Sequence, residues 1–574
     1  MSIYLDIEAN GLDPDTIWCV VTKDNCKTRE GTTIVHTSPD TLQDALRGRM
    51  SVVGHNLIGY DLPVLKSLWG VSVEPERVID TLVLSRLSNP SREGGHSLRA
   101  WGERLGFPKG DYSDWSKLTQ EMIDYCIQDV KVTEHTHFKL MTEMRDFSQE
   151  SIDLEHKVQF IIQQQIRNGW LLDERQAFDL LAQLKEKQYD LEEKVQQTFR
   201  PIPVYVKSVS PRYKKDGALS SVGLTFLGDS WQNVCGEFSR IESVPFNLAS
   251  RKQIGVHLQR FGWKPEKFTE TGQPVVDEST LSRVKGIPEA QMIAEYLLVQ
   301  KRVAQVQSWV DAMGKDGRVH GFVNTNGAVT GRMTHSKPNL AQTPAGYSPF
   351  GKECRSCWTV PVGHKLVGVD ASGLELRMLA HYMNDPAYTE EIVNGDIHST
   401  NQRAAGLPDR DTSKTFIYAF LYGAGDEKLG SIVGGRRSRG TELRQRFLKA
   451  TPALADLQQR VRKKGGEGTL RGLDGRLLQI RSEHASLNTL LQAAGAIVMK
   501  QALILLDKFS REWKINYRFV GNIHDEIQTE VKADQAEKFG HLAVSCIEAA
   551  GLHFDLRCPL TGEYHVGDNW SQTH

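Results

Sequence analysis

The segment Tyr517–Val531, with the sequence YRFVGNIHDEIQTEV, constrains this chain more than any other. Hydrophobic or small residues alternate with others before and after a central break, at Tyr517, Phe519, Gly521, Ile523, Ile527, Thr529 and Val531. This alternation predicts two short strands joined by a turn at His524-Asp525-Glu526. Adjacent carboxylates at a hairpin tip are poorly paired and can bind a cation, although an ordinary solvated acidic turn explains these residues equally well. The rest of the chain must decide between the two interpretations.

Length and composition set the broad class. The chain has 574 residues, which exceeds one domain and predicts several compact units. Since 70 Lys and Arg residues balance 71 Asp and Glu residues, net charge argues neither for nor against a nucleic-acid partner. Eight scattered cysteines favour reduced thiols, and a predicted strand from Ser2 to Ile7 leaves no room for a signal peptide. No long apolar run is evident, so we expect an intracellular protein without a membrane partner.

Acidic residues recur in the predicted N-terminal α/β domain. Asp6 and Glu8 are two residues apart in a strand and so face the same side. Asp61 lies near the start of a predicted helix that follows the segment VVGHNLIGY. Asp129 follows Tyr125 by four residues, which places both on one helical face. Carboxylates in such a set can share divalent cations.

One ligand position of this set has two candidates. Asp80 and Asp129 both occur at suitable places in the N-terminal domain. Only Asp129 is preceded by a tyrosine four residues earlier, and this favours Asp129.

A further acidic residue follows the apolar strand Leu366–Val369. Asp370 ends this strand, and a helix carrying Glu375 follows it. An acid in this place is often a helix cap, but Ser372 is the better cap candidate. We therefore expect Asp370 to be available as a ligand.

The helix within Asp409–Tyr422 carries an unusual stripe. Arg410, Lys414, Tyr418 and Tyr422 recur every four residues and so form one face with two cations followed by two aromatic rings. A core would leave both charges unpaired, whereas a triphosphate and a base would use all four side chains. The stripe therefore predicts a nucleotide-binding face.

Two other pairs suit contact with a nucleic acid. Asn488 and Gln492 share one helical face, and amides can bind minor-groove acceptors without sequence preference. Lys301 and Arg302 are adjacent on a long predicted helix and could grip a duplex backbone, although a purely structural helix pair is the alternative.

Several of these segments resemble known motifs. VDASGLELR, RDTSKTFIYAFLYGAG and IHDEIQTEV, together with TGRMTHSKPNLAQTP, resemble the motifs of family A DNA polymerases, in the same order. DIE, NLIGYD and YCIQD resemble the three motifs of DEDD proofreading exonucleases of the Tyr subtype. The whole chain is most similar to the replicative DNA polymerases of short-tailed bacteriophages. The resemblance implies a multidomain α/β fold, with an RNase H-like exonuclease domain and a right-hand polymerase domain of thumb, palm and fingers with an antiparallel palm sheet.

The resemblance also implies a division of the chain. The 3′–5′ exonuclease domain would span residues 1–148, and the thumb 149–316 with a shortened insertion at about 200–245. The palm would comprise residues 317–388 and 493–574, with the fingers at 389–492 between its two parts.

Roles for individual residues follow from the matched motifs. In the exonuclease site Asp6, Glu8, Asp61 and Asp129 would hold metal ions, and Tyr125 would orient the attacking water. In the polymerase site the metal ligands would be Asp370 and Asp525, with His524 and Glu526 in support and His524 near the DNA. Nucleotide contacts would come from Arg410, Lys414, Tyr418, Tyr422, His398 and Glu375, the last disfavouring a 2′-hydroxyl. Contacts with primer-template DNA would come from Arg332, Asn488 and Gln492, and we assign Lys301 and Arg302 to the same DNA.

The implied cofactor is Mg²⁺, two ions in each active site, with Mn²⁺ as a substitute. The implied partners are primer-template DNA, deoxynucleoside triphosphates and a phage helicase-primase, in the cytoplasm of an infected bacterial host. Relatives that bind host thioredoxin carry a longer thumb insertion, so the short segment 200–245 argues against thioredoxin binding. Alternatives are a bacterial repair polymerase of the same family, a single-subunit RNA polymerase, and a non-catalytic nucleic-acid-binding relative.

Overall fold

The computed structural model describes residues 2–25, 31–48, 50–210, 212–218, 220 and 236–573. It divides into two compact units. The first comprises Met1–Asp173 and Ala312–His574, and the second is Glu174–Asp311. Each unit has its own hydrophobic core and is described separately.

The N-terminal part of the first unit is built on a five-stranded sheet of order β3-β2-β1-β4-β5. The strands are β1 (Ser2–Ala9), β2 (Ile17–Asp24), β3 (Thr33–His36), β4 (Ser51–Gly54) and β5 (Val78–Asp80). β1 runs antiparallel to β2 and parallel to β4. β1 is buried on both faces, because Ile3, Leu5 and Ile7 pack on one side while Tyr4 packs on the other.

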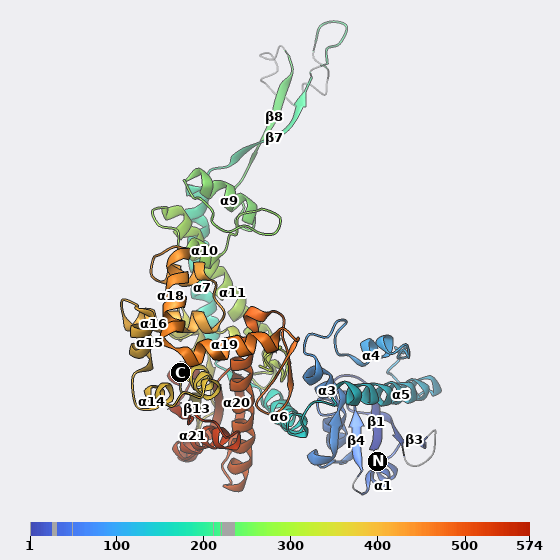
Figure 1. The fold of residues 1–574 in the computed structure, drawn as a ribbon. Helices are drawn as coiled ribbons and strands as arrows, with labels where there is room; N and C mark the ends of the chain where they lie inside the picture. The colour runs from blue at the N-terminus through green and yellow to red at the C-terminus, as the bar shows by residue number, and fades with distance from the viewer. Residues whose placement is uncertain are drawn as a thin grey trace. The chain divides into compact units, whose positions relative to one another are not determined.

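Helices cover both faces of this sheet. The longest is α5 (Gln120–Glu143), which packs Cys126 and Val130 against Tyr4 and crosses the sheet in Figure 1. The other helical segments here are α1 (Pro39–Leu46), α2 (Asp61–Val64), η1 (Leu65–Trp69), η2 (Pro75–Arg77), α3 (Thr81–Ser88) and α4 (Leu98–Arg104). Asp6 and Glu8 have the same parity as Tyr4, so their side chains face α5.

A second sheet organises the remainder of the first unit. Its order is β16-β17-β13-β18, and all neighbours are antiparallel. The strands are β13 (His364–Ala371), β16 (Tyr517–Ile523), β17 (Glu526–Lys532) and β18 (Gly562–Gly567). The hairpin predicted from the alternation is thus confirmed, with its turn at His524 and Asp525.

Helices α20 (Ser486–Glu512) and α21 (Ala536–His553) contribute much of the core that surrounds this sheet. The segment Glu483–Glu512 is long and apolar enough to cross a membrane by composition, which the expectation of no long apolar run overlooked. Of its most apolar window 72% is buried inside the fold, as in the core helix of a globular protein.

Shorter elements complete the first unit. Three small sheets are formed by β12-β6-β9, by β10-β11 and by β14-β15. Their strands are β6 (Trp170–Leu172), β9 (Arg318–Val319), β10 (Phe322–Asn324), β11 (Thr334–Ser336), β12 (Trp358–Thr359), β14 (Thr469–Arg471) and β15 (Leu477–Gln479). The remaining helices are α6 (Gln149–Asn168), η4 (Leu340–Gln342), α12 (Gly351–Ser356), α13 (Leu374–Met383), α14 (Pro386–Val393), α15 (Ile397–Ala405), α16 (Arg410–Leu421), α17 (Asp426–Ile432), α18 (Arg437–Ala450), α19 (Pro452–Gly465), η5 (Glu483–Ala485), η6 (Ala533–Gln535) and η7 (Trp570–Gln572).

One helix start differs from the prediction. Ser372 was expected to cap the helix after Asp370, but α13 begins after Gly373, whose φ of 59° is left-handed, and has no side-chain cap. Glycine adopts this conformation without steric strain, so the turn is made by the backbone.

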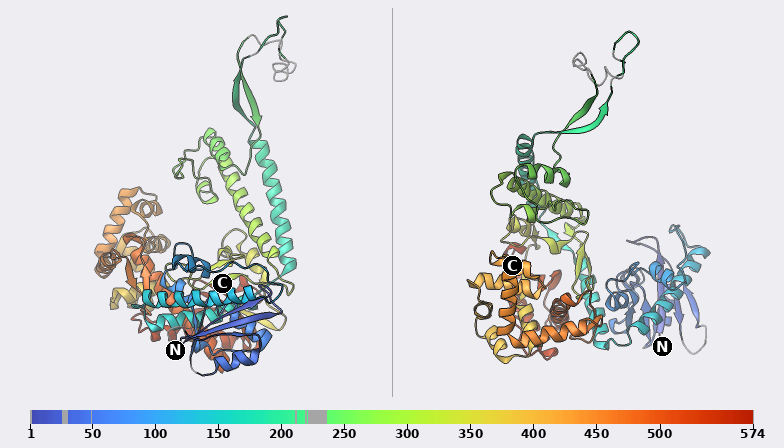
Figure 2. Two further views of the ribbon diagram at one scale, coloured as in Figure 1. Left: turned by 90° about the vertical axis from the view of Figure 1, so that its right-hand side faces the viewer. Right: turned by 45° about the horizontal axis from the view of Figure 1, so that its top comes forward.

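The second unit combines two long packed helices, α7 (Glu174–Thr198) and α11 (Pro288–Asp311), with shorter helices and a β-ribbon. The shorter helices are α9 (Arg251–Arg260) and α10 (Glu278–Leu281), and β7 (Ile202–Val209) pairs with β8 (Phe238–Val244). Figure 2 shows α7 and α11 side by side, with the ribbon beyond the end of α7. The ribbon lies in the segment 200–245, which was expected to be a shortened insertion; residues 211, 219 and 221–235 lie outside the described part.

Candidate functional site: two carboxylate centres

The N-terminal sheet and helix α5 bring the first set of predicted residues to one place. Asp6 and Glu8 on β1, and Tyr125 and Asp129 on α5, line one open pocket. Asp61 begins α2. Burial, followed by the charge of the nearby Asp6, raises the pKa of Asp61. The structure therefore brings four of these residues to one pocket and Asp61 close to Asp6.

Burial and mutual repulsion dominate the electrostatics of this centre. Burial, followed by the charge of Asp129, raises the pKa of Asp6 to about 8. Burial and the neighbouring acids also raise the pKa values of Glu8 and Asp61. Burial raises the pKa of Asp129 to about 6, although Lys109 opposes this shift. Carboxylates held together in this way are stabilised in their charged form by a nearby cation.

Lys109 and Cys126 are neighbours that the sequence did not single out. Lys109 forms an ion pair with Asp129 and lies 4.7 Å from the ring centre of Tyr125. The Cys126 Sγ donates to Asp6 Oδ2 at 3.7 Å. Burial raises the pKa of this thiol, so it stays protonated beside the carboxylates. Cys126 lies inside the YCIQD motif but carries no role there, and Lys109 belongs to no motif, because only the fold brings it to α5.

Asp80 and Asp129 differ in the hydrogen bonds that their carboxylates accept. Asp80 caps α3, and its carboxylate accepts the backbone N–H groups of Asn56, Ile58 and Leu82 at 2.9–3.0 Å. Because both oxygens of the Asp80 carboxylate accept these backbone N–H groups, its role is structural. Asp129 instead faces the pocket.

The donor set suits a hard divalent cation. One ligand oxygen from Asp6, one from Glu8 and the Cys126 sulfur all lie within 4.8 Å of one another. Asp61 and Asp129 are electrostatically coupled to this group. Oxygen-rich, negatively charged and partly open to solvent, the pocket fits Mg²⁺ or Mn²⁺ better than a softer metal.

The second centre forms where β13 meets the β16–β17 hairpin. Asp370 pairs with Glu526 across the two strands. The N–H of Ala371 donates to the backbone oxygen of Asp525 at 3.3 Å, which places Asp525 beside the end of β13. Burial, followed by the charge of Glu375, raises the pKa of Asp525. Residues more than 150 positions apart in sequence are thus adjacent.

Glu375 is held by two partners above this edge. The Tyr422 hydroxyl donates to both of its carboxylate oxygens, at 2.8 and 2.9 Å, and Arg332 pairs with it at 3.1 Å. The Tyr418 ring lies near the same acids, since burial and the charges of Glu375, Asp525 and Asp370 raise its pKa. These observations link α13, α16 and the hairpin at one site.

The predicted stripe is present on α16. Tyr418 and Tyr422 stack with their ring centres 6.4 Å apart, and His398 on α15 lies 6.5 Å from Tyr418. Arg410 forms an ion pair of 2.9 Å with Asp396, a residue that the sequence did not single out. Burial, followed by the charges of Arg410 and Lys414, lowers the pKa of His398, so this histidine of α15 lies near both predicted cations.

The remaining predicted residues differ from one another in exposure and in the contacts that they make. Asn488 and Gln492 are partly exposed on the otherwise largely buried helix α20. His524 has a φ of 60° at the hairpin turn, and the Glu526 carboxylate accepts the Trp570 indole N–H at 2.6 Å. Lys301 is exposed on α11 in the second unit.

Arg302 differs from its neighbour on α11. It is only 7% exposed, and its guanidinium donates to Gln305. This side chain therefore lies within the second unit rather than on its surface, which argues against the predicted contact with DNA.

Comparisons with known proteins agree with these motifs. Residues 226–572 match the model of DNA polymerase family A. The chain is 35% identical to a DNA-directed DNA polymerase of Enterobacteria phage T3, over 93% of this chain and 94% of that protein. It is 34% identical to a DNA-directed DNA polymerase of Escherichia phage T7, over the full length of both.

A solved structure is similar over the whole chain. The polymerase domain of Pol1 from M. smegmatis, in complex with DNA primer-template and dNTP, matches with a TM-score of 0.77 and 18% identity. The match covers 100% of this chain and 95% of that one. With the family model and the two phage relatives, the conclusion is direct: this chain belongs to DNA polymerase family A.

Proposed function

We propose that this family A polymerase adds deoxynucleotides to a primer 3′ end at the Asp370–Asp525 centre, and removes 3′-terminal nucleotides at the Asp6–Asp129 centre. One observation carries the first assignment: the pairing of β13 with β17 brings two acids from distant segments together, near the Tyr418 ring of α16. The phage relatives, DNA-directed DNA polymerases matched over nearly their full length, support the same activity.

Divalent cations are the cofactors that these carboxylates fit. Asp370 and Asp525 would hold Mg²⁺ at the polymerase centre, and Asp6, Glu8, Asp61 and Asp129 at the other, with two ions at each and Mn²⁺ as a substitute. When bound, such ions stabilise negative charge on the attacking and leaving oxygens of a phosphodiester. The raised pKa values of Asp6 and Asp525 are consistent with this fit, because both acids lack a full complement of positive charge.

The side chains around the polymerase centre would bind and orient the nucleotide. Arg410 and Lys414 match triphosphate oxygens in charge, with His398 beside them. The Tyr418 ring offers a stacking surface for the sugar and base. Glu375, fixed by Tyr422 and Arg332, is positioned to disfavour a 2′-hydroxyl.

The primer-template would lie across several elements. Asn488, Gln492, Arg332 and His524 on the first unit are the proposed DNA contacts, supported by Glu526 behind the turn. Lys301 on the second unit is a proposed backbone contact, since it is exposed and cationic.

At the N-terminal centre the chain supplies its own positioning groups. Tyr125 would orient a water molecule toward the scissile phosphate. Lys109 would balance the charge of Asp129 until a cation binds, through the contacts described above. The mixed sheet of order β3-β2-β1-β4-β5 supports an RNase H-like assignment for residues 1–148.

The domain division follows the same reasoning. Residues 149–316 are assigned to the thumb, 317–388 and 493–574 to the palm, and 389–492 to the fingers. Helix α6 belongs to the first compact unit, although sequence position puts it in the thumb. We further infer action in the cytoplasm of an infected bacterial host with a phage helicase-primase. The short insertion at 200–245 argues against binding of host thioredoxin.

Substitution of one ligand in each centre tests the two assignments. Asp525→Asn should reduce nucleotide addition by on the order of a thousandfold or more and leave 3′–5′ degradation unchanged, because a metal ligand is worth several kcal/mol. Asp6→Ala should do the reverse. Primer extension with all four deoxynucleotides measures the first activity, and shortening of a labelled single strand without nucleotides measures the second.

Two matched controls complete the experiment. Asp534→Asn and Asp13→Ala change exposed acids of the same two regions and should leave both activities intact. Loss of both activities in either ligand variant would refute the two-site assignment.

A further inference from the structure

Asn522 is the residue through which other elements hold the Asp525 turn. It lies on β16, three residues before Asp525, and is 7% exposed. Both its side chain and its backbone carbonyl bond to elements outside the second sheet. A strand end that is fixed in this way can move little relative to those elements.

The first contact comes from α6. The Asn522 Nδ2 donates to the Gln165 Oε1 at 2.6 Å, and both side chains are buried. Three residues further along α6, Asn168 Nδ2 donates to the carbonyl of Phe519 on the same strand at 3.0 Å. Because a buried amide that loses its partner pays its full desolvation cost, Gln165 and Asn522 are expected to stay together.

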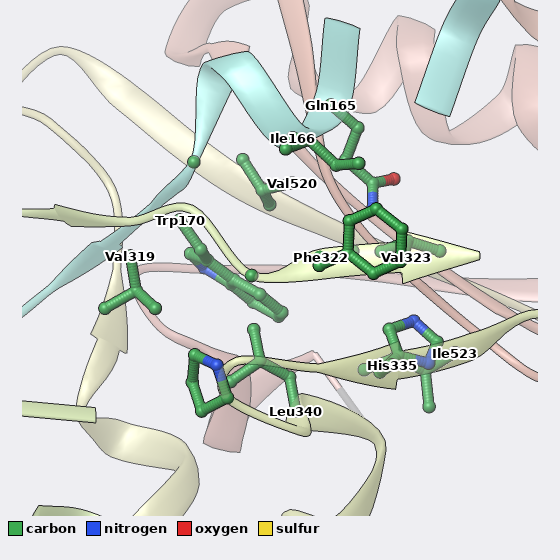
Figure 3. A pocket seen from close by; sticks show the side chains of 14 residues that line it. Gln165, Ile166, Trp170, Val319, Phe322, Val323, His335, Leu340, Val520 and Ile523 are labelled. Carbon is green, nitrogen blue, oxygen red and sulfur yellow. The ribbon is translucent and has the colours of Figure 1, made fainter. Parts of the chain in front are cut away.

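The second contact comes from β11. His335 Nε2 donates to the carbonyl oxygen of Asn522 at 2.9 Å. A carbonyl only accepts, so this bond assigns the proton to Nε2, and burial lowers the pKa of His335 to about 4, which keeps the ring neutral. Figure 3 shows His335 and Gln165 among the side chains that line one small cavity, with His335 next to Ile523.

The β10–β11 hairpin thereby connects two parts of the polymerase centre. His335 holds the strand that leads to Asp525, and Arg332, three residues earlier, holds Glu375. His524, between Asn522 and Asp525, has a left-handed φ of 60°, which is uncommon for a residue other than glycine. A strained turn persists only where its surroundings fix it.

We propose that His335 and Gln165 are positioning residues that hold Asn522 and thereby aim the Asp525 carboxylate. The proposal rests on the assignment of Asp525 to the polymerase centre. Loss of either contact would let the turn relax, and small displacements of catalytic groups cost up to about a hundredfold in rate. The expected effect is on the rate of nucleotide addition, because neither side chain is assigned to the nucleotide or the DNA.

Paired variants at each position test the proposal. His335→Phe keeps an aromatic ring and removes the donor, whereas His335→Gln keeps an N–H that can reach the Asn522 carbonyl. His335→Phe and Gln165→Leu should lower the single-turnover rate of nucleotide addition by about tenfold to a hundredfold. The concentration of deoxynucleotide for half-maximal rate should change by less than about threefold, and His335→Gln should retain most of the wild-type rate.

Two further readouts separate aiming from folding. Hydrogen–deuterium exchange of the backbone from Tyr517 to Lys532 should accelerate in His335→Phe and Gln165→Leu, and not in His335→Gln. Degradation of single-stranded DNA at the N-terminal centre should stay at the wild-type rate in all three variants, which shows that the chain is folded.

The outcomes are distinct. Wild-type addition rates in His335→Phe and Gln165→Leu would overturn the proposal, as would equal losses in His335→Phe and His335→Gln. If Asp525→Asn, measured alongside, also kept full activity, then the assignment of Asp525 itself would fail rather than the positioning role alone.

Discussion

The two carboxylate centres of this chain manage their negative charge in opposite ways. The N-terminal centre gathers Asp6, Glu8, Asp61 and Asp129 around Lys109, and burial with mutual repulsion raises the pKa values of these acids. At the polymerase centre, Glu375 is bonded to Arg332 and Tyr422, and Arg410 is paired with Asp396. The first centre therefore leaves most of its negative charge for protons or added cations to balance, whereas Glu375 at the second is balanced by the chain itself.

The centres also differ in how they are assembled. The first centre is built from one sheet and the helices packed on it, and all of these elements lie before the end of α5 at Glu143. The second joins segments separated by much of the chain and relies on buried polar contacts beneath it. Its assembly should accordingly be the more sensitive to changes far from the chemistry.

A buried ion cluster next to the polymerase centre allows a direct test of this sensitivity. Glu155 on α6 pairs with Lys500 on α20 at 2.6 Å and with Arg476 at 2.7 Å, and Arg476 is also bound by Asp474. All four side chains are at most 3% exposed. Lys500 lines a small cavity together with Arg332 and His524, so the cluster lies directly behind the site.

The largest effect is expected for Glu155→Gln. Removing Glu155 leaves one buried positive charge uncompensated at Lys500, because Asp474 still pairs with Arg476, and this costs about 3–5 kcal/mol of unfolding free energy. Urea unfolding measures this loss. Nucleotide addition should fall with it, while degradation of single-stranded DNA should persist under native conditions, because the N-terminal sheet does not depend on the cluster.

Glu150→Gln is the matched control on the same helix. Glu150 is about half exposed and pairs with His553 on the surface, so its replacement should cost less than about 1 kcal/mol. Equal destabilisation by the two substitutions would contradict the role of the buried cluster.

An intermediate effect is expected at the other centre for Asp6→Asn in the presence of EDTA. The folded-state pKa of Asp6 is raised to about 8 from an ordinary value near 4. Between these values the folded chain binds a proton that the unfolded chain does not, so stability falls as pH rises through this window. At pH 8 the variant should therefore be more stable than the wild type, by on the order of 1 kcal/mol or more.

Thermal unfolding at pH 8 and pH 5 with EDTA measures this difference, which should shrink at pH 5 as the wild-type acid becomes protonated. Added Mg²⁺ should stabilise the wild type more than the variant. Asp525→Asn should change stability in the same direction, because burial and the charge of Glu375 also raise the pKa of Asp525, although His524 and Arg332 oppose that shift. A variant less stable than the wild type at pH 8 in EDTA would show that the acids at the N-terminal centre are already compensated.

The smallest effect is expected for Lys109→Met. This lysine pairs with Asp129 and so competes with a bound cation for the same carboxylate. Its loss should lower the Mg²⁺ concentration needed for half-maximal thermal stabilisation by about tenfold. This magnitude takes into account that solvent partly screens the charge of Lys109. Lys139→Met, on the exposed side of α5, is the control and should leave the Mg²⁺ requirement unchanged. A higher Mg²⁺ requirement in Lys109→Met would mean that the lysine organises the ligands rather than competing with metal.

Local patterns in the sequence were sufficient for much of this architecture. Alternation predicted the β16–β17 hairpin. Four-residue spacing predicted that the stripe residues share one face of α16 and that Tyr125 and Asp129 share one face of α5. Both follow because strand and helix periodicities are properties of the backbone. The motifs also predicted membership of the family, which the comparisons confirmed. The predicted cap at Ser372 was wrong, since a left-handed glycine makes that turn instead.

Only the tertiary structure decided which partners meet. Lys109 reaches Asp129, Asp396 reaches Arg410, and Asp80 is occupied by three backbone N–H groups, none of which follows from spacing along the chain. Arg302 is buried although its sequence neighbour is exposed. Sequence alone thus determined which residues could carry the chemistry, because motifs are local. Charge pairing, burial and the position of Asn522 depend on contacts between distant segments, and those exist only in the folded chain.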